Sequence, residues 1–549
     1  MRLSSMMRAP APRSGGWHLL LVGCLWLLAP MALPAQTVDS ALVAAPPLVH
    51  AVVIQRADIF DAQELTKWYA RVANGLHIMT RESVIRREIL FRAGEPYDSA
   101  RVAETERNLR ALGIFRRVTI DTVRSDSGLV VRVRARDAWS TQGDVRLSSS
   151  GGEIAYLLNL TEINFLGTGS RVGVQYRSDP DRTAVTLGYG SSRFLGSTIA
   201  LNMFLDARSD GTIFSGSVGR PFRSLDSRSG YSLFGLVGDF TVLRFRGGNP
   251  QPAQVLRRKA GLGRLSAEWT VKGDRRRQLR ASLTGQIRRD DFVPDSAIPT
   301  PFPKTITAAA GVAMTLVIPR FTVTSSVMGF GREEDVNLTT SASFGVWAAP
   351  ELAGYPVNGV GLTFGLRTGL PLGRGYVRLG AEANGLFTGE GADSGTVVLG
   401  TTVALKPSAR QVIFLHGEVG WQHNPTPGAE FDLGLALGLR AFRAHSYTGT
   451  RMFYTSAEIR HVFAREALGL FGMALAAFVD YGGAWFPDEP RRSGWDAGFG
   501  IRAGINRSND VDAFRIDLVY RFPSDVVPPG WVLSLGRSLP FTLLPQGRS

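Results

Sequence analysis

Arg440 and Asp480 are the two charged residues whose surroundings in the sequence suggest a specific contact. Asp480 lies in a segment, residues 471–481, in which large apolar residues alternate with small ones and this single carboxylate. Such alternation is typical of a strand between lipid and a polar interior. A carboxylate inside a barrel is costly unless it is paired. A guanidinium from the preceding loop can supply a bidentate partner, so the chemistry expected here is an ion pair.

The same alternation predicts which side chains of this strand face lipid and which face the interior. The residues expected to face lipid are Phe471, Met473, Leu475, Ala477, Val479 and Tyr481, and those expected inside are Gly472, Ala474, Ala476, Phe478 and Asp480.

The rest of the sequence offers no constellation for catalysis or metal binding. The seven histidines are scattered, and the chain has no His-x-x-x-His pair and no Cys-x-x-Cys pair. No Gly-x-Ser-x-Gly elbow precedes a helix. The glycines of Gly167-Thr168-Gly169 lack the βαβ context of a dinucleotide-binding loop and are interpreted as strand bends or small residues facing the interior. We expect no enzyme activity, no cofactor and no metal.

Length, charge and hydropathy narrow the class of protein. The chain has 549 residues, a formal net charge of +15, and 62 glycines. After the first 35 residues, no uncharged apolar run is long enough to cross a bilayer as a helix, so a membrane-spanning form would be a β-barrel. The arginines are spread along expected strands and loops without a basic helix. We therefore expect no nucleic-acid partner and interpret the charge as facing the barrel interior and lipid headgroups.

The N-terminal segment is typical of a secretory signal. Residues 1–35 carry Arg2, Arg8 and Arg13 before an apolar run, and they end on an Ala-Leu-Pro-Ala cleavage site. The only cysteine, Cys24, lies in that run, and Leu21-Val22-Gly23-Cys24 also resembles a lipoprotein cleavage box. Removal of the segment after Ala35 is the favoured alternative. Residues 36–48 are expected to form a linker.

Residues 49–138 are expected to form a small α+β domain. The pattern predicts a strand at residues 50–55, helices at 64–74, 82–91 and from 98 or 99 to 112, and then two strands. Gly113 is the stop signal of the third helix. In the last strand one face is apolar and the other carries three arginines. The apolar residues are Leu129, Val131, Val133 and Ala135.

Residues 139–541 show short alternating segments separated by turn residues, the pattern of an antiparallel barrel. In the segment 514–522, apolar and charged residues alternate, with Arg515 and Asp517 expected to face the interior. The last strand is expected at residues 531–541, followed by a tail at 542–549. Pro540 cannot donate a hydrogen bond to a neighbouring strand, which predicts a weakly closed seam between the last and first strands.

Two motifs resemble known families. In residues 80–136 the chain is similar to a polypeptide-transport-associated (POTRA) domain, and its C-terminal half resembles the BamA/TamA superfamily, also called bacterial surface antigens. Ala441 stands where that family has glycine in its sixth-loop motif. The POTRA-like residues are Ile85-Arg86-Arg87-Glu88, Phe91 to Gly94, Pro96-Tyr97, Arg107-Asn108-Leu109 and Leu112-Gly113-Ile114-Phe115; the barrel motif residues are Leu439, Arg440, Phe442, Phe478, Asp480 and Gly482.

The resemblance implies an outer-membrane barrel of sixteen strands, carrying one POTRA domain in the periplasm of a bacterium. It implies a factor that captures unfolded outer-membrane proteins and templates their insertion at the barrel seam. The implied partners are those clients, outer-membrane lipid and accessory lipoproteins. We expect a client to add a strand to the POTRA strand that contains Leu129, Val131, Val133 and Ala135.

Two other functions compete with assembly. A translocator would export a partner through the barrel lumen, but the sequence shows one POTRA domain and no obvious plug. A passive channel would not need a POTRA domain.

Overall fold

The computed structural model of the chain describes residues 46–537, apart from 126–127, 151–152, 225, 295–304, 326, 331–332, 435–437 and 506–512. The predicted signal segment 1–35 and tail 542–549, most of the linker 36–48, and Pro540 lie outside the described residues. None of the described helices is long and apolar enough to cross a bilayer.

The N-terminal domain is a three-stranded sheet covered by helices on one face. β1 (Val49–Ala57) pairs in parallel with β3 (Gly128–Asp137), which pairs antiparallel with β2 (Phe115–Ser125). α3 (Glu82–Glu88) and α4 (Ser99–Ala111) bury their apolar residues against this sheet. The Asp98 side chain caps α4 by accepting from the N–H groups of Ala100 and Arg101.

The predicted helix at residues 64–74 begins later than expected. Residues Glu64–Thr66 form a 3-10 turn, η2, and α2 spans Trp68–Leu76. The Asn74 side chain fixes α2 by bonding both the N–H and the C=O of Phe60.

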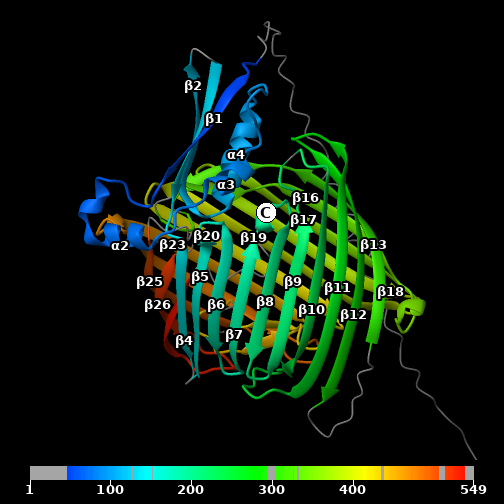
Figure 1. Cartoon of the computed structure of the whole chain (residues 1–549). Coiled ribbons are helices and arrows are strands. Elements are labelled where there is room, and N and C mark those ends of the chain that lie inside the picture. The colour runs from blue at the N-terminus through cyan, green and yellow to red at the C-terminus, as the bar shows by residue number, and fades with distance from the viewer. Residues whose placement is uncertain are drawn as a thin grey trace, which may run out of the picture. The chain divides into compact units, whose positions relative to one another are not determined.

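The C-terminal domain is a closed antiparallel barrel of twenty strands, not the sixteen expected (Figure 1). The expected number assumed about 25 residues per strand with its connections. Several strands are shorter and joined by tight turns, so the same length holds four more. In order around the wall, the strands are β4 (Thr141–Ser150), β5 (Glu153–Phe165), β6 (Ser170–Ser178), β7 (Thr183–Ser191), β8 (Ala200–Arg208), β9 (Gly211–Arg220), β10 (Ser229–Arg244), β11 (Gln254–Gly273), β12 (Gln278–Pro294), β13 (Thr305–Ile318), β16 (Thr340–Ala349), β17 (Gly359–Leu372), β18 (Gly375–Thr388), β19 (Gly391–Ser408), β20 (Gln411–His423), β23 (Arg451–Ala467), β24 (Phe471–Trp485), β25 (Gly494–Ile505), β26 (Phe514–Arg521) and β27 (Gly530–Arg537).

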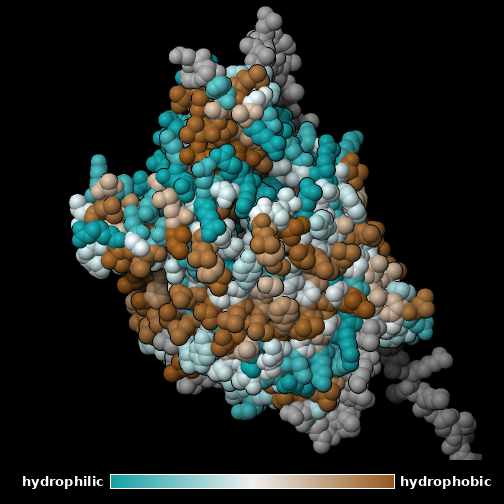
Figure 2. Space-filling view, viewed as in Figure 1, coloured by the Kyte–Doolittle hydropathy of each residue, from teal (hydrophilic) through white to brown (hydrophobic). Residues whose placement is uncertain are grey.

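The outer surface of the barrel carries an apolar belt. Figure 2 shows this belt crossing the middle of the wall, with hydrophilic surface above and below it. In β24 the exposed and buried residues alternate as the sequence predicts: Leu475 and Val479 are exposed, whereas Ala474 and Asp480 are buried. β26 follows the same rule. A belt with this period is the lipid-facing surface of a membrane barrel.

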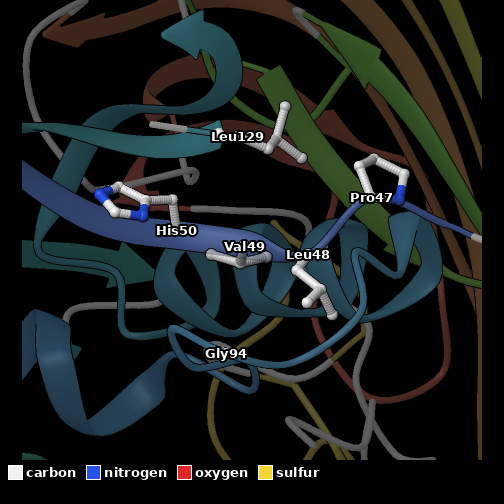
Figure 3. A pocket seen from close by; sticks show the side chains of 7 residues that line it. Pro47, Leu48, Val49, His50, Gly94 and Leu129 are labelled. Carbon is white, nitrogen blue, oxygen red and sulfur yellow. The ribbon is translucent and has the colours of Figure 1, made fainter. Parts of the chain in front are cut away.

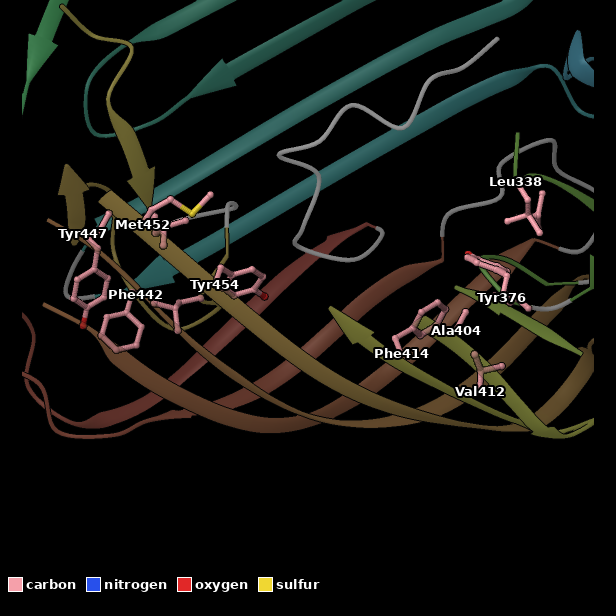
Figure 4. Close-up of a cluster of buried hydrophobic side chains, with 14 of the residues drawn as sticks. Leu338, Tyr376, Ala404, Val412, Phe414, Phe442, Tyr447, Met452 and Tyr454 are labelled. Carbon is pink, nitrogen blue, oxygen red and sulfur yellow. The ribbon is translucent and has the colours of Figure 1, made fainter. Parts of the chain in front are cut away.

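Apolar side chains from the wall and from a loop fill part of the barrel lumen. A buried apolar cluster inside the barrel joins side chains of β18 and β20 to those of β23 and a lumenal loop (Figure 4). Members from the loop are Leu439, Phe442 and Tyr447; members from the wall include Tyr376, Val412, Phe414, Met452 and Tyr454.

The barrel closes at a weak seam, as predicted. In the described residues, β27 and β4 are paired at a single position, Ser534 with Ser148. On its other side, β27 pairs with β26 over eight residues without a register shift. The wall is therefore continuous but held least firmly between its last and first strands.

The N-terminal domain contacts the rim of the barrel on the side of the β5–β6 turn. The N–H of Arg81 donates to the C=O of Gly167 at 2.9 Å, and Arg193 forms an ion pair with Glu88 at 2.7 Å. Gly167 has a φ of 69°, and a Cβ there would lie 2.6 Å from the carbonyl oxygen of Met79. Gly167 and Gly169 are therefore turn residues at a domain contact, and not the strand bends or interior-facing residues that the sequence predicted.

Candidate functional site

The lumenal loop that carries Arg440 lies between two short strands inside the barrel. β21 (Phe431–Leu433) pairs with β22 (Tyr447–Gly449) and closes the base of the loop. Arg440 is fully buried, as is Asp480 on β24, and their Nε and Oδ2 atoms lie 3.0 Å apart. The structure therefore brings together the two charges that the sequence singled out.

The contact differs from the expected bidentate pair because Arg440 bridges two carboxylates. Its Nη1 donates to Glu458 of β23 at 2.8 Å, while its Nε faces Asp480. The other oxygen of Asp480 accepts from the hydroxyls of Ser456, at 2.6 Å, and Tyr454, at 3.2 Å. That carboxylate therefore has one oxygen left for the guanidinium.

Phe478 and Gly482, the other strand residues of the motif, also contact this loop or its neighbours. The Phe478 ring lies under the guanidinium of Arg440, with 3.7 Å between the ring centroid and Cζ, a cation–π contact. At Gly482 a Cβ would lie 3.1 Å from both the carbonyl oxygen of Phe453 and the ring of Tyr454. Gly482 therefore permits close packing of β24 against β23.

Ala441 adopts the loop conformation without the positive φ that its family counterpart, glycine, would favour. Its N–H donates to Asp496 of β25 at 3.0 Å, and its C=O accepts from Arg521 of β26 at 2.7 Å. Phe442 follows and packs on Tyr447, with ring centroids 5.3 Å apart. The loop is thus held to the wall by its backbone as well as by Arg440.

The ion pair is part of a larger buried network. Arg502 of β25 bridges Glu458 at 2.9 Å and Asp517 of β26 at 2.5 Å, and Arg515 pairs with Asp517 at 2.7 Å. Asp517 also lies 3.7 Å from Arg440. Sequence alternation placed Arg515 and Asp517 inside the barrel, but it gave no sign of Arg502 as their partner.

With Arg460 on Glu458, the network holds four guanidinium groups and four carboxylates. Its members are Arg440, Arg460, Arg502 and Arg515, and Glu458, Asp480, Asp496 and Asp517. The ion pairs among these groups make their burial tolerable, since unpaired buried charges are very costly. The geometry positions the loop against the barrel wall.

His445 anchors the other end of the loop. Its ring lies between the carboxylates of Asp181, at 2.9 Å, and Asp432, at 2.6 Å, and it stacks on Phe245 with 3.5 Å between centroids. Burial disfavours the charged ring, but hydrogen bonds to both carboxylates outweigh burial and raise the pKa of His445 to about 9. The imidazolium therefore joins the loop to the β6–β7 turn at neutral pH.

A hairpin that the sequence did not predict extends into the lumen from the rim that faces the N-terminal domain. It consists of β14 (Phe321–Ser325) and β15 (Glu333–Asn337), between β13 and β16. The side chain of Glu334 accepts from the N–H groups of Val327, Met328 and Gly329 and so closes the hairpin tip.

The hairpin tip reaches the wall that holds the charged network. Phe330 packs with Val462 and Ala474, which are lumenal residues of β23 and β24. A Cβ at Gly472 would lie 2.3 Å from the Cβ of Phe330, so glycine leaves room for this ring. The C=O of Val327 accepts from Arg460 at 3.4 Å. The lumen therefore holds a hairpin that the sequence did not predict.

The same hairpin contacts the N-terminal domain. Arg110 of α4 pairs with Asp335 of β15 at 2.5 Å, and the Arg107 guanidinium lies 4.9 Å from the ring centroid of Phe321. The hairpin thus contacts α4 of the N-terminal domain and strands β23 and β24 of the barrel.

The predicted client-binding edge is not an edge. β3 lies between β1 and β2, so its backbone groups are already paired on both sides. Its apolar side chains are buried beneath the helices: Leu129, Val131, Val133 and Ala135. The prediction was wrong because the parallel pairing of β1 with β3 joins segments far apart in the sequence. Among the described strands of this sheet, β1 and β2 are the two outer strands.

A cavity of about 580 Å³ opens at the end of β1 that is remote from the barrel (Figure 3). Its lining is mostly apolar or backbone, and His50 is its one titratable side chain. The lining residues are Pro47, Leu48, Val49, His50, Gly94, Gly128 and Leu129.

Comparison with known proteins agrees with this architecture. Residues 72–136 match the POTRA family model, described as surface antigen variable number repeat. No curated protein matches the chain.

Among solved structures, the chain is similar to BamA from Haemophilus ducreyi lacking POTRA domains 1–3, with 13% identity and a TM-score of 0.37. That match covers 89% of this chain and 84% of that one. It is also similar to CdiB from Escherichia coli, with 12% identity and a TM-score of 0.44, covering 95% of each chain. The chain therefore combines a segment that matches the POTRA family model with a closed antiparallel barrel.

Proposed function

We propose that this protein inserts unfolded outer-membrane proteins into the bacterial outer membrane. In this proposal the POTRA domain lies in the periplasm and captures clients, and the seam between β27 and β4 templates their strands. Accessory lipoproteins are proposed as further partners of the POTRA domain.

The observation that carries the proposal is the seam, where a single residue pair joins β27 to β4 within the part of the chain that the structure describes. Unpaired backbone N–H and C=O groups are costly in lipid. A client strand therefore gains most hydrogen bonds where the barrel wall can open and present the unpaired edge of one of its own strands. Opening this seam breaks far less pairing than opening the eight-residue ladder of β26 and β27. The POTRA domain supplies a second edge, β2, to which an extended client can add a strand.

A direct test measures the folding rate of an unfolded model barrel protein in liposomes containing this protein. A disulfide between Ser148→Cys and Ser534→Cys locks the seam, since these residues are direct cross-strand partners. The matched control locks β26 to β27 through Leu518→Cys and Leu533→Cys, which are also partners. Both are made with Cys24→Ser, which leaves no other cysteine.

We expect the seam lock to abolish acceleration until the disulfide is reduced, whereas the control lock leaves acceleration intact. Deletion of residues 36–138 should also abolish it. Equal acceleration by the seam-locked and reduced proteins would refute insertion at the seam.

Export through the lumen is a second candidate, and the lumenal hairpin favours it. A conduit that opens only for its cargo needs an element that closes it at rest, and β14–β15 is a candidate because it lies against β23 and β24 inside the lumen. Conductance measured in the same liposomes separates the two functions. Unchanged client folding, together with a large conductance that appears only with an exported partner, would favour export.

A further inference from the structure

The segment between β1 and α3, residues 58–81, adds η2 and α2 to the domain, and most of it precedes the POTRA match at residue 72. It is held firmly in place. The inner face of α2 packs Tyr69, Ala70 and Ala73 against Trp139, just before β4, and Leu470, in the β23–β24 turn. At its C-terminal end, His77 bonds Asp137 at 2.8 Å.

The outer face of α2 is apolar although none of the described elements covers it. Trp68, Val72 and Leu76 follow each other at four-residue intervals and so lie on one face of the helix. Their exposed fractions are 70%, 50% and 72%. Ile78 and Met79, just after the helix, are also exposed. A docked helix that presents a tryptophan and two aliphatic side chains to solvent leaves a costly surface unless something apolar covers it.

Two cations adjoin this apolar face. Arg71 is exposed on the side of the helix opposite to Tyr69 and Ala73. Lys67 is the N-cap residue, and its Nζ lies 5.8 Å from the ring centroid of Tyr69, at the border of the docked side. In the part of the chain that the structure describes, neither lies within ion-pair distance of a carboxylate. The helix therefore has one side docked on the barrel and one apolar side, with Arg71 and Lys67 at the borders of these two sides.

The apolar face is continuous with the apolar belt of the barrel. α2 lies beside the rim at β23 (Figure 1), and a Cβ at Gly469 of the β23–β24 turn would lie 3.2 Å from Lys67 Nζ. Leu468 in that turn is 85% exposed. Phe463 and Phe471 on the adjoining strands are exposed on the lipid-facing side. The belt thus extends past the rim onto α2.

We propose that α2 is an interfacial membrane helix: it lies in the headgroup region of the leaflet on the POTRA side, buries Trp68, Val72 and Leu76 among acyl chains, and pairs Lys67 and Arg71 with anionic phospholipid. An amphipathic helix with aromatic and aliphatic residues on one side and lysine or arginine on the other binds such a surface. The contact fixes the POTRA domain relative to the bilayer beside β23–β24. It requires the barrel to lie in a bilayer, but it is independent of the assembly activity.

The test places one environment-sensitive fluorophore at a time on the full chain with Cys24→Ser, reconstituted in vesicles of phosphatidylcholine and phosphatidylglycerol. The labelled sites are Val72→Cys on α2, Leu475→Cys in the belt and Arg124→Cys at the far end of β2. Leu475 is a lipid-facing reference, and Arg124 is an exposed residue near the end of an eleven-residue strand that begins at the barrel junction. Lipids carry a nitroxide quencher either at the headgroup or deep in the acyl chain.

We expect headgroup nitroxides to remove most of the Val72 emission, deep nitroxides to act best on Leu475, and Arg124 to keep its emission with both. Replacing Lys67 and Arg71 with glutamine should reduce quenching at Val72. The difference from the parent chain should grow as the phosphatidylglycerol fraction of the vesicles rises. If Val72 behaves like Arg124 while Leu475 is quenched, the proposal is wrong and the face belongs to a protein partner. Absence of quenching at Leu475 would overturn both the proposal and the bilayer position of the barrel.

Discussion

Arg440 has two carboxylates and an aromatic ring as direct neighbours, so its loss affects several groups together. Without it, Asp480 and Glu458 would face each other across a buried space with one cation fewer. The lost attraction is smaller than the cost of leaving a buried carboxylate unpaired, which is the usual asymmetry of buried ion pairs. The role of Arg440 is therefore to keep a charged wall neutral as well as to position a loop.

We predict that Arg440→Ala lowers the free energy of unfolding by about 3–5 kcal/mol, the range for breaking a buried pair. Arg440→Lys should cost less, because it keeps the charge but loses the planar contact with Phe478. Denaturant unfolding in detergent micelles measures both. The matched control is Arg264→Ala, an exposed arginine on β11 bonded to Gln286, with an expected change within about 0.5 kcal/mol. Equal losses for Arg440→Ala and the control would contradict this role.

His445 makes the attachment of the same loop depend on pH. Because its folded pKa, about 9, lies above the ordinary value of 6.5, the contact contributes fully below 6.5 and is lost as pH rises through 9. We predict that tryptic cleavage after Arg443 accelerates as pH rises through that value, after correction for the activity of trypsin. With His445→Asn, cleavage should be fast at neutral pH and show no such step. A step that persists in this variant would assign the effect to another group.

At the scale of elements, the lumenal hairpin β14–β15 links parts of the molecule that are distant in sequence. Its tip packs on β23 and β24 through Phe330, and its base pairs with α4 through Asp335. A movement of the POTRA domain therefore acts directly on the element that occupies the lumen.

We predict that replacing residues 321–337 with a short Gly-Ser turn increases the single-channel conductance, because the hairpin side chains no longer occupy the lumen. The matched control replaces residues 351–357 in the β16–β17 connection, where Leu352 is fully exposed. That control should conduct like the parent protein. Unchanged conductance after removal of the hairpin would show that another element closes the lumen.

Sequence patterns predicted elements with a local period and missed those set by distant pairing. The faces of β24 and β26 were predicted because a strand repeats every two residues. The central place of β3 was missed because its partner β1 lies more than seventy residues upstream. The hairpin was missed because its short strands mix charged and apolar residues as solvated loops do. The contact of Arg440 with Asp480 followed from alternation and family motif, but the bridging role of Arg502 had no sequence signal.

At the scale of the whole molecule, stability is distributed unevenly around the barrel. β24 is paired along most of its length on both sides, whereas β27 has a full ladder on one side and a single pair on the other. Strands with fewer hydrogen bonds open at lower free energy.

We predict that backbone amides of β27 exchange with deuterium faster than those of β24, and that the Ser148→Cys, Ser534→Cys disulfide slows exchange in β27 selectively. Mass spectrometry of the reconstituted protein measures both. Similar exchange in β24 and β27 would mean that the seam is no weaker than the rest of the wall.

The wall also varies in height around its circumference. β6, β7 and β8 have nine residues each, whereas β11 has twenty. At about 3.4 Å per residue and a tilt of about 40°, these strands span about 23 Å and 52 Å. A typical hydrocarbon layer is about 30 Å thick, so lipid beside the short strands must compress while lipid beside β11 need not. This hydrophobic mismatch lies within a few strands of the seam. The acyl-chain length of the surrounding lipid therefore sets how much the bilayer must thin beside this part of the barrel.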